Sequence, residues 1–319
     1  MYNKITTLTE FIIQEERRYP SSTGSLTLLL TQIEIATKII ASHIKKTGLV
    51  DIIGQAGSIN AYDEEVQKLD EFSNRLLVDI LQEGGQTYAI ASEELDEPLK
   101  VVKNKGEYAV FLDPLDGSSN IDTNINIGTI FSVYHKSSDL LRPGKEQVAA
   151  GYILYGSSVM FVYSSGNGVN GFTLDPSIGS FVLSHPRMQV PQNGSIYSVN
   201  EGYIHLFDEK DKKYLSDLKQ GTRPYKLRYV GSMVSDVHRT LCKGGIFLYP
   251  RDTHHPDGKL RLMYEVNAMA YIMTQAGGMA VSGNKNPLLI KPKTLVDRVP
   301  VALGSSEEVK KYMTYHGEA

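Results

Sequence analysis

The sequence of 319 residues predicts a protein that combines an α+β part with an α/β part, and three observations indicate this class. Helical periodicity dominates roughly the first eighty residues. Short apolar runs separated by hairpin-like turns follow, from residue 108 to residue 183. Strand and helix patterns then alternate. We therefore expect an N-terminal domain over residues 1–188 and a C-terminal α/β domain over residues 189–319, with sites at strand ends.

Two helices are predicted in the N-terminal part. Apolar residues recur at three- and four-residue spacing from residue 26 to about residue 44, which is typical of an amphipathic helix. A second such pattern covers residues 66–81 and is followed by Glu83-Gly84-Gly85, where a helix can end. Helices therefore come first in this fold.

A series of strands is expected in the middle of the chain. Residues 108–112 are a short apolar run bounded by polar residues, as in a buried strand. Similar runs cover residues 128–135, 148–155, 159–163, 168–174 and 180–183. Turns rich in Gly, Asn and Ser, such as residues 164–168, predict an antiparallel meander.

The C-terminal part alternates. Strands are predicted over residues 227–230, 245–249 and 279–282, and helices over residues 232–243, 260–275 and 306–316. The polar stretch that contains Pro186, Pro191, Asn193 and Gly194 is the candidate domain boundary.

Composition excludes several classes of protein. The chain has 33 basic and 36 acidic residues, a net charge of -3 and 41% hydrophobic residues, which is ordinary for a globular protein and does not suit an electrostatic nucleic-acid binder. No signal peptide or membrane span is expected, because no stretch approaches 18 uninterrupted apolar residues. The single cysteine, Cys242, can form no intrachain disulfide, fits a cytoplasmic protein and is expected to be a small core residue.

The most informative segment follows the strand predicted at residues 108–112 and reads Asp113-Pro114-Leu115-Asp116-Gly117-Ser118-Ser119-Asn120. Two carboxylates on either side of a proline bend can converge on one point, and Mg²⁺ prefers oxygen ligands of this kind. The carbonyl of Leu115 suits the same ion, while the small residues after Asp116 can present N–H groups and hydroxyls to an anion. The alternative is a plain surface turn, since Asp-Pro and Asp-Gly are common turn dipeptides.

A second acidic pair, Glu93-Glu94, also follows a short apolar segment, residues 88–91. Taken alone it is compatible with a solvated strand edge, because Glu is rarely buried unless it is paired. Two such sites in one chain favour a metal centre. His254-His255 is more simply a loop pair, because no further His or Cys cluster has zinc spacing.

With these motifs the chain resembles the class I fructose-1,6-bisphosphatases of the bacterial kind over nearly its whole length. The likeness lies in Lys68-Leu69-Asp70, Ser92-Glu93-Glu94 and residues 113–120, 149–152, 200–203, 228–233 and 258–265. Inositol monophosphatases share the Asp-Pro-x-Asp-Gly-Ser core. The Arg228-Tyr229 and Lys259-Leu260-Arg261 segments are what narrow the resemblance to the fructose-1,6-bisphosphatases. It implies a layered α/β/α/β/α sandwich of the sugar phosphatase type.

The resemblance also implies roles for individual residues. Two or three Mg²⁺ ions, or Mn²⁺ or Zn²⁺, would be held by Glu64, Glu93, Asp113, the Leu115 carbonyl, Asp116 and Glu265. Asp70 and Glu94 would position and deprotonate the attacking water, although Asp70 is also compatible with an ordinary exposed helical acid. The implied substrate-binding residues are Asp116, Gly117, Ser118, Ser119, Asn200, Tyr203, Arg228, Tyr229, Tyr249, Lys259 and Arg261. Arg228 would reach the site of a neighbouring subunit in a homotetramer, and Tyr249 is equally compatible with a packed aromatic at a strand end.

The implied reaction is hydrolysis of fructose 1,6-bisphosphate to fructose 6-phosphate and phosphate in gluconeogenesis. The alternatives are sedoheptulose bisphosphate or an inositol phosphate as substrate, or a non-catalytic sugar-phosphate sensor. The family's AMP site is implied at Thr23, Gly24, Thr27 and Tyr108. Glu107 and His135 stand where the family commonly has Lys and Arg, so we expect weak or altered inhibition by AMP.

Overall fold

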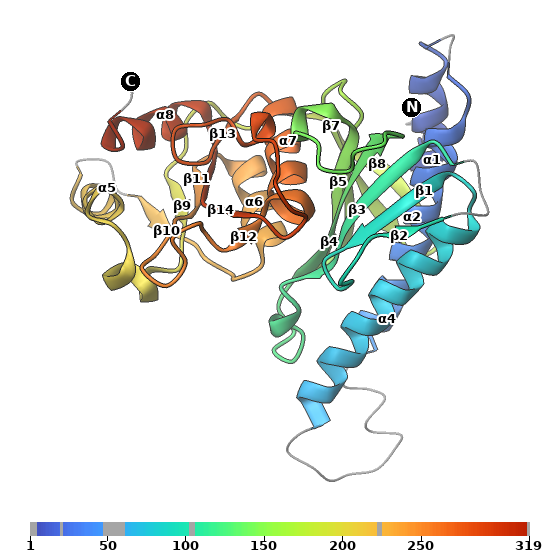
Figure 1. Ribbon diagram of the computed structural model, residues 1–319, viewed down its shortest axis with the longest axis horizontal. Coiled ribbons are helices and arrows are strands. Elements are labelled where there is room, and N and C mark those ends of the chain that lie inside the picture. The colour runs from blue at the N-terminus through green and yellow to red at the C-terminus, as the bar shows by residue number, and fades with distance from the viewer. Residues whose placement is uncertain (1–4, 20–21, 47–60, 102–105, 222–224, 318–319) are drawn as a thin grey trace.

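The protein is built in five layers that run from one side of the molecule to the other (Figure 1). The structure is a computed structural model that describes residues 5–19, 22–46, 61–101, 106–221 and 225–317, without the side chains of residues 61–68. N-terminal helices cover an eight-stranded sheet, a central pair of helices follows, and a five-stranded sheet and outer helices complete the stack. The expected α/β/α/β/α sandwich is confirmed.

In the described part of the chain, the first layer consists of α1 (Leu8–Glu16), α2 (Ser25–Ile44) and α4 (Ala61–Glu83). Leu29, Ile33 and Ile40 on α2 are fully buried among the apolar residues of the eight-stranded sheet. By length and composition alone α2 could cross a membrane, but half of its most apolar window is buried inside the molecule. This burial is what an amphipathic core helix shows.

The eight-stranded sheet has the order β2-β1-β3-β4-β5-β6-β7-β8. Its strands are β1 (Thr87–Ser92), β2 (Leu99–Lys100), β3 (Tyr108–Asp116), β4 (Ile127–His135), β5 (Gln147–Tyr155), β6 (Val159–Ser164), β7 (Val169–Asp175) and β8 (Ser180–Met188). From β3 to β8 each strand is antiparallel to the next, so the expected meander is confirmed. β1 runs parallel to β3, which places the ends of both strands at one edge of the sheet.

The central helices α6 (Met233–Lys243) and α7 (Asn267–Gln275) pack between the two sheets. The second sheet has the order β10-β9-β11-β15-β13, and α5 and α8 cover its other face. These elements are β9 (Ile196–Ser198), β10 (Lys226–Leu227), β11 (Ile246–Tyr249), β13 (Met279–Val281), β15 (Val301–Gly304), α5 (Glu209–Gln220) and α8 (Ser306–Tyr315). A separate ribbon pairs β12 (Leu260–Arg261) with β14 (Arg298–Val299).

Three details of the C-terminal prediction are wrong. The helix expected over residues 260–275 starts as β12, passes through a π-helical turn at Leu262–Val266 and becomes α-helical only at Asn267. The strand expected over residues 227–230 ends at Leu227, because the N–H groups of Val230 and Gly231 bind the Asp236 carboxylate instead of a neighbouring strand. Cys242 is exposed, since it lies off the buried face of the amphipathic helix α6.

Candidate metal centre and substrate pocket

An irregularity in β3 brings Asp113 and Asp116 to one place. Residues three apart on a regular strand point to opposite faces of the sheet. Here Asp113 pairs with Ile130 and Asp116 pairs with Gly128, so three steps on β3 match two steps on β4. The extra residue is a β-bulge, which returns both carboxylates to the same side. Residues 113–116 are therefore buried strand rather than the plain surface turn that the sequence also allowed.

Three buried carboxylates form the centre of the site. Oxygen atoms of Asp113, Asp116 and Glu265 all lie within 4.8 Å of one another, and the exposed fraction of each residue is 8% or less. Burial, together with the charges of Asp116 and Glu265, raises the pKa of Asp113 well above its usual range. Burial also raises the pKa of Asp116, and it raises that of Glu265 to about 7. Converging buried carboxylates that repel one another are a donor set that fits Mg²⁺.

The N-terminus of α6 holds Asp116 in this cluster. The N–H groups of Met233 and Val234 donate to the two carboxylate oxygens at 3.2 and 2.9 Å, and the Ser232 hydroxyl donates at 2.7 Å. The N-terminal end of a helix is a natural partner for a negative charge. Gly117 allows this approach, because its φ is +76° and a Cβ there would lie 2.6 Å from the Ser232 Cβ. Sequence reasoning missed Ser232, since only the three-dimensional contact assigns it to the site.

Glu265 and Arg261 are tied together by the turn between β12 and α7. The backbone N–H of Arg261 donates to Glu265 at 2.6 Å, and its guanidinium forms an ion pair with Glu93 at the end of β1. Arg298, which faces Arg261 across the β12–β14 ribbon, donates to the carbonyl of Lys259.

Asp70 on α4 lies near Glu94 and near the short 3₁₀ turn that begins at Ser118. Burial raises the pKa of Asp70 to about 6, the Ser118 hydroxyl bonds to its carboxylate, and the charge of Glu94 adds to the rise. Glu93 is half-buried and Glu94 is exposed. Asp70 is therefore not an ordinary exposed helical acid. Glu64 is on the same helix, but its side chain lies outside the described residues.

A pocket of about 190 Å³ gathers four of the predicted sugar-binding residues: Asn200, Tyr203, Tyr249 and Lys259. The Tyr229 hydroxyl interacts with the side chains of Asn200 and Tyr249. Burial raises the pKa of both Tyr229 and Tyr249, and the nearby charges of Asp116 and Glu265 contribute to the two shifts. The pocket and the carboxylates are thus parts of one site.

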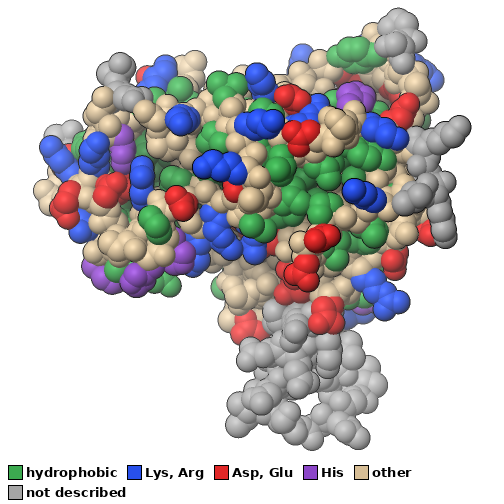
Figure 2. All heavy atoms as spheres, viewed as in Figure 1, with side chains coloured by type: hydrophobic (Ala, Val, Ile, Leu, Met, Phe, Trp, Pro, Cys, Tyr) green, Lys and Arg blue, Asp and Glu red, His purple; other side chains and the backbone are tan. Residues whose placement is uncertain are grey.

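The cation Lys259 borders the pocket directly. The Lys259 ammonium lies 5.9 Å from the centre of the Tyr203 ring. In the space-filling view Lys and Arg side chains gather between the two halves of the molecule, next to acidic side chains (Figure 2). Arg228 is exposed and its guanidinium donates to the Leu227 carbonyl at 2.7 Å, rather than to the pocket. Ser119 is exposed.

His254 and His255 both line the pocket and do not join the carboxylates, which form the one candidate metal cluster in the described part of the chain. His255 pairs with Asp252 through Nδ1 at 2.9 Å. This agrees with the interpretation of the two histidines as a loop pair.

A larger cavity, of about 680 Å³, lies between α1, α2 and β3 and is lined by Thr23, Thr27, Tyr108 and His135. Gly24 is the N-cap of α2, with φ of +81°. The Glu16 carboxylate lies at this helix end, where it accepts hydrogen bonds from Ser22 and from the Thr27 hydroxyl. The hydrogen bond from Ser22 is the main cause that holds the pKa of Glu16 below its usual value.

Comparison with known proteins identifies the family. Residues 6–186 match the family "Fructose-1-6-bisphosphatase, N-terminal domain" and residues 190–317 match its C-terminal domain. A class 1 fructose-1,6-bisphosphatase of Persephonella marina is 52% identical over 321 residues, covering 99% of each chain. One of Sulfurihydrogenibium sp. is 54% identical over 310 residues, covering 95% of each.

Solved structures agree. The crystal structure of Leishmania major fructose-1,6-bisphosphatase in holo form has a TM-score of 0.90 and 41% sequence identity, covering 98% of this chain and 99% of that chain. The apo form gives a TM-score of 0.89 and 39% identity, with the same coverage. The chain therefore belongs to the class 1 fructose-1,6-bisphosphatase family.

Proposed function

We propose that this chain hydrolyses the 1-phosphate of fructose 1,6-bisphosphate, giving fructose 6-phosphate and phosphate as a step of gluconeogenesis. The observation that carries this proposal is the buried cluster of Asp113, Asp116 and Glu265 beside a pocket lined by tyrosines and Lys259. The test is phosphate release in the presence of Mg²⁺ from fructose 1,6-bisphosphate, sedoheptulose bisphosphate and inositol monophosphate. The first substrate should be turned over fastest. A clear preference for either other compound would contradict the proposal, and binding without turnover would favour the sensor.

Two or three Mg²⁺ ions, which Mn²⁺ or Zn²⁺ can replace, are the proposed cofactor. Asp113, Asp116, Glu265 and the Leu115 carbonyl would hold them, with Glu93 and Glu64 as further ligands. Bound Mg²⁺ neutralises the scissile phosphate and lowers the pKa of water. The ion pair between Arg261 and Glu93 supports placing a guanidinium next to the 1-phosphate.

Asp70 is the proposed base, helped by Glu94. A carboxylate with a raised pKa is a better proton acceptor than an ordinary aspartate, and it is still ionised at neutral pH. The hydrogen bond from Ser118 fixes its orientation. The same turn, with Gly117 and Ser119, would offer N–H and hydroxyl groups to the phosphate oxygens.

The pocket is proposed to hold the sugar and the 6-phosphate, and Lys259 gives a direct test. Lys259→Met should raise the KM for fructose 1,6-bisphosphate about tenfold, because one charged contact to a phosphate is lost. The KM for fructose 1-phosphate, which has no 6-phosphate, should change much less. Lys285→Met, an exposed site outside the pocket, is the matched control. Equal effects of Lys259→Met on both substrates would place Lys259 elsewhere.

The remaining assignments are proposals of the same kind. The domains would divide at residue 188, where β8 ends. A homotetramer in the cytoplasm is proposed, in which Arg228 acts in the site of a neighbouring subunit. Arg228 is exposed and is not among the residues that line the pocket of its own chain, which supports this role.

AMP is proposed to be a weak inhibitor of this chain. Thr23, Gly24, Thr27 and Tyr108 would form the site, but the Glu16 carboxylate already binds at this helix end and Glu107 adds a second negative charge. Both charges repel a phosphate. Inhibition by AMP should be weak in the wild type and should strengthen in Glu107→Lys, as measured by titration of activity. Tight inhibition of the wild type would contradict this prediction.

A further inference from the structure

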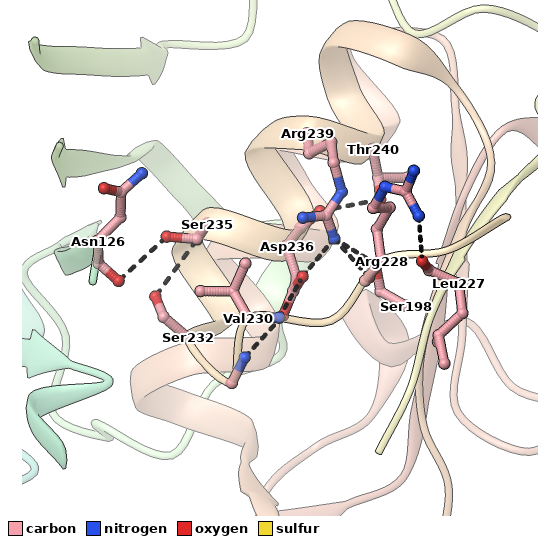
Figure 3. A network of polar contacts seen from close by, with 11 residues as sticks. Asn126, Ser198, Leu227, Arg228, Val230, Ser232, Ser235, Asp236, Arg239 and Thr240 are labelled. Atoms are coloured by element: carbon pink, nitrogen blue, oxygen red, sulfur yellow. Dashed lines mark hydrogen bonds and ion pairs between the residues drawn. The ribbon is translucent and has the colours of Figure 1, made fainter. Parts of the chain in front are cut away.

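The loop of residues 228–232 joins β10 to α6, and Figure 3 shows Arg228, Val230 and Ser232 along it. Tyr229 lies within it, with its hydroxyl among the side chains of the pocket. At the end of the loop the Ser232 hydroxyl donates to Asp116 in the carboxylate cluster at 2.7 Å. One short segment therefore connects the pocket to the proposed metal ligands.

Asp236 holds the middle of this loop. Its side chain is fully buried and accepts hydrogen bonds from the N–H groups of Val230, at 3.0 Å, and Gly231, at 3.2 Å. Gly231 has a φ of +88°, in the left-handed region that glycine tolerates. A buried carboxylate is costly unless it is paired and hydrogen-bonded, so this geometry is strongly favoured once it forms.

Arg239, one turn further along α6, supplies the pairing charge. Its Nη2 forms an ion pair with Asp236, and it donates to the Arg228 carbonyl at 2.7 Å and to the Ser198 hydroxyl on β9 at 2.6 Å (Figure 3). The guanidinium thereby fastens the start of the loop to the second sheet. Neither Asp236 nor Arg239 lines the pocket or belongs to the carboxylate cluster.

We propose that Asp236 and Arg239 are a positioning pair that fixes the 228–232 loop, and that the loop couples the sugar-phosphate pocket to the metal cluster. Arg239 sets the backbone before Tyr229, and Asp236 sets the backbone after it. At the end of the loop the Ser232 hydroxyl donates to Asp116, so the position of the loop also sets the position of this carboxylate. The inference rests on the proposed function, because it assigns the pocket to the substrate and the cluster to Mg²⁺.

The first test is Arg239→Gln. It should raise the KM for fructose 1,6-bisphosphate about tenfold and raise the Mg²⁺ concentration needed for half-maximal activity, while kcat falls less. Its melting temperature should fall by several degrees, because the buried Asp236 carboxylate loses its ion-pair partner, but the variant should still fold. Arg239→Lys keeps the charge but lacks the planar fork of the guanidinium. Its KM and Mg²⁺ requirement should therefore lie between those of the wild type and Arg239→Gln. Lys243→Gln, which removes an exposed charge from the same helix, is the matched control and should behave as wild type.

The second test is a double-mutant cycle with Tyr229→Phe. If Arg239 acts through Tyr229, the fold-changes in KM caused by the two substitutions should not multiply. The KM of the double variant should then resemble that of the worse single variant. A residue with a merely structural role would give independent, multiplying effects on KM.

The positioning role would be overturned if Arg239→Gln left KM and the Mg²⁺ requirement unchanged. It would also be overturned if the fold-changes in KM of Arg239→Gln and Tyr229→Phe multiplied in the double variant. Failure of both Arg239 variants to fold would also overturn it, because it would assign the pair to stability. A wild-type protein without activity on fructose 1,6-bisphosphate would instead refute the proposed function, so the two failures are distinguishable.

Discussion

Asp113→Asn is expected to abolish hydrolysis of fructose 1,6-bisphosphate, lowering kcat by at least about a thousandfold. The change removes one negative charge and one oxygen donor from the three carboxylates that converge within 4.8 Å. Electrostatic stabilisation of the transition state in a water-excluded site commonly contributes about a hundred- to a thousandfold per group, and a lost ligand weakens the bound ion as well. Steady-state kinetics at saturating Mg²⁺ would measure the loss.

The fold should survive this substitution. Because the pKa of Asp113 is raised in the folded protein, the stability linked to this carboxyl is present below its ordinary pKa and is lost as the pH rises through the folded value. Without metal at pH 8, the variant should therefore melt at the same temperature as the wild type or higher. Asp175→Asn, where β7 ends, is the control for the kinetic measurement. Activity within a few-fold of the wild type in Asp113→Asn would contradict the metal centre.

Asp70→Asn should lower kcat by about a hundred- to ten-thousandfold with little change in KM, as expected when a general base is removed. In the wild type kcat should fall below about pH 6, because Asp70 must be ionised to accept a proton and its pKa is raised to about 6. Bound cations favour the ionised form, so the observed limb should lie at or below that pH. The pH profile of kcat for both proteins measures this.

The matched control for Asp70→Asn is Asp79→Asn, an exposed position on the same helix, which should keep full activity. In the variant the acid limb due to Asp70 should disappear from the residual activity. A wild-type limb that persists unchanged in Asp70→Asn would assign the base to another group. An equal loss in Asp79→Asn would indicate a general defect of α4.

The periodic elements were predictable because their packing is regular. The α2 pattern has apolar residues on one face, and the six strands of the meander are separated by turns with recognisable residues, so the helix and the sheet order followed directly from local chemistry. Short or polar elements were not predicted. α5 is largely charged and β9 has three residues, so neither carries a strong local signal.

The sequence indicated which residues to consider for the candidate site, but not their geometry. The motif at residues 113–120 indicated a cation site, yet the β-bulge that aligns Asp113 with Asp116 depends on pairing with β4. The prediction that a helix covers residues 260–275 was wrong at its start for a related reason. The N–H of Arg261 donates to the Glu265 side chain and β12 pairs with β14, so distant partners decide the conformation where the site requires it.

The central claim is that the buried carboxylates hold the divalent cation on which hydrolysis depends. The most direct measurement is phosphate release from fructose 1,6-bisphosphate by protein treated with a chelator and then supplied with Mg²⁺ in steps. We expect no phosphate release above background without the divalent metal and full recovery when Mg²⁺ is added. Addition of sulfate or Na⁺ alone should restore no phosphate release. Turnover that continues unchanged after the divalent metal has been removed would contradict the account.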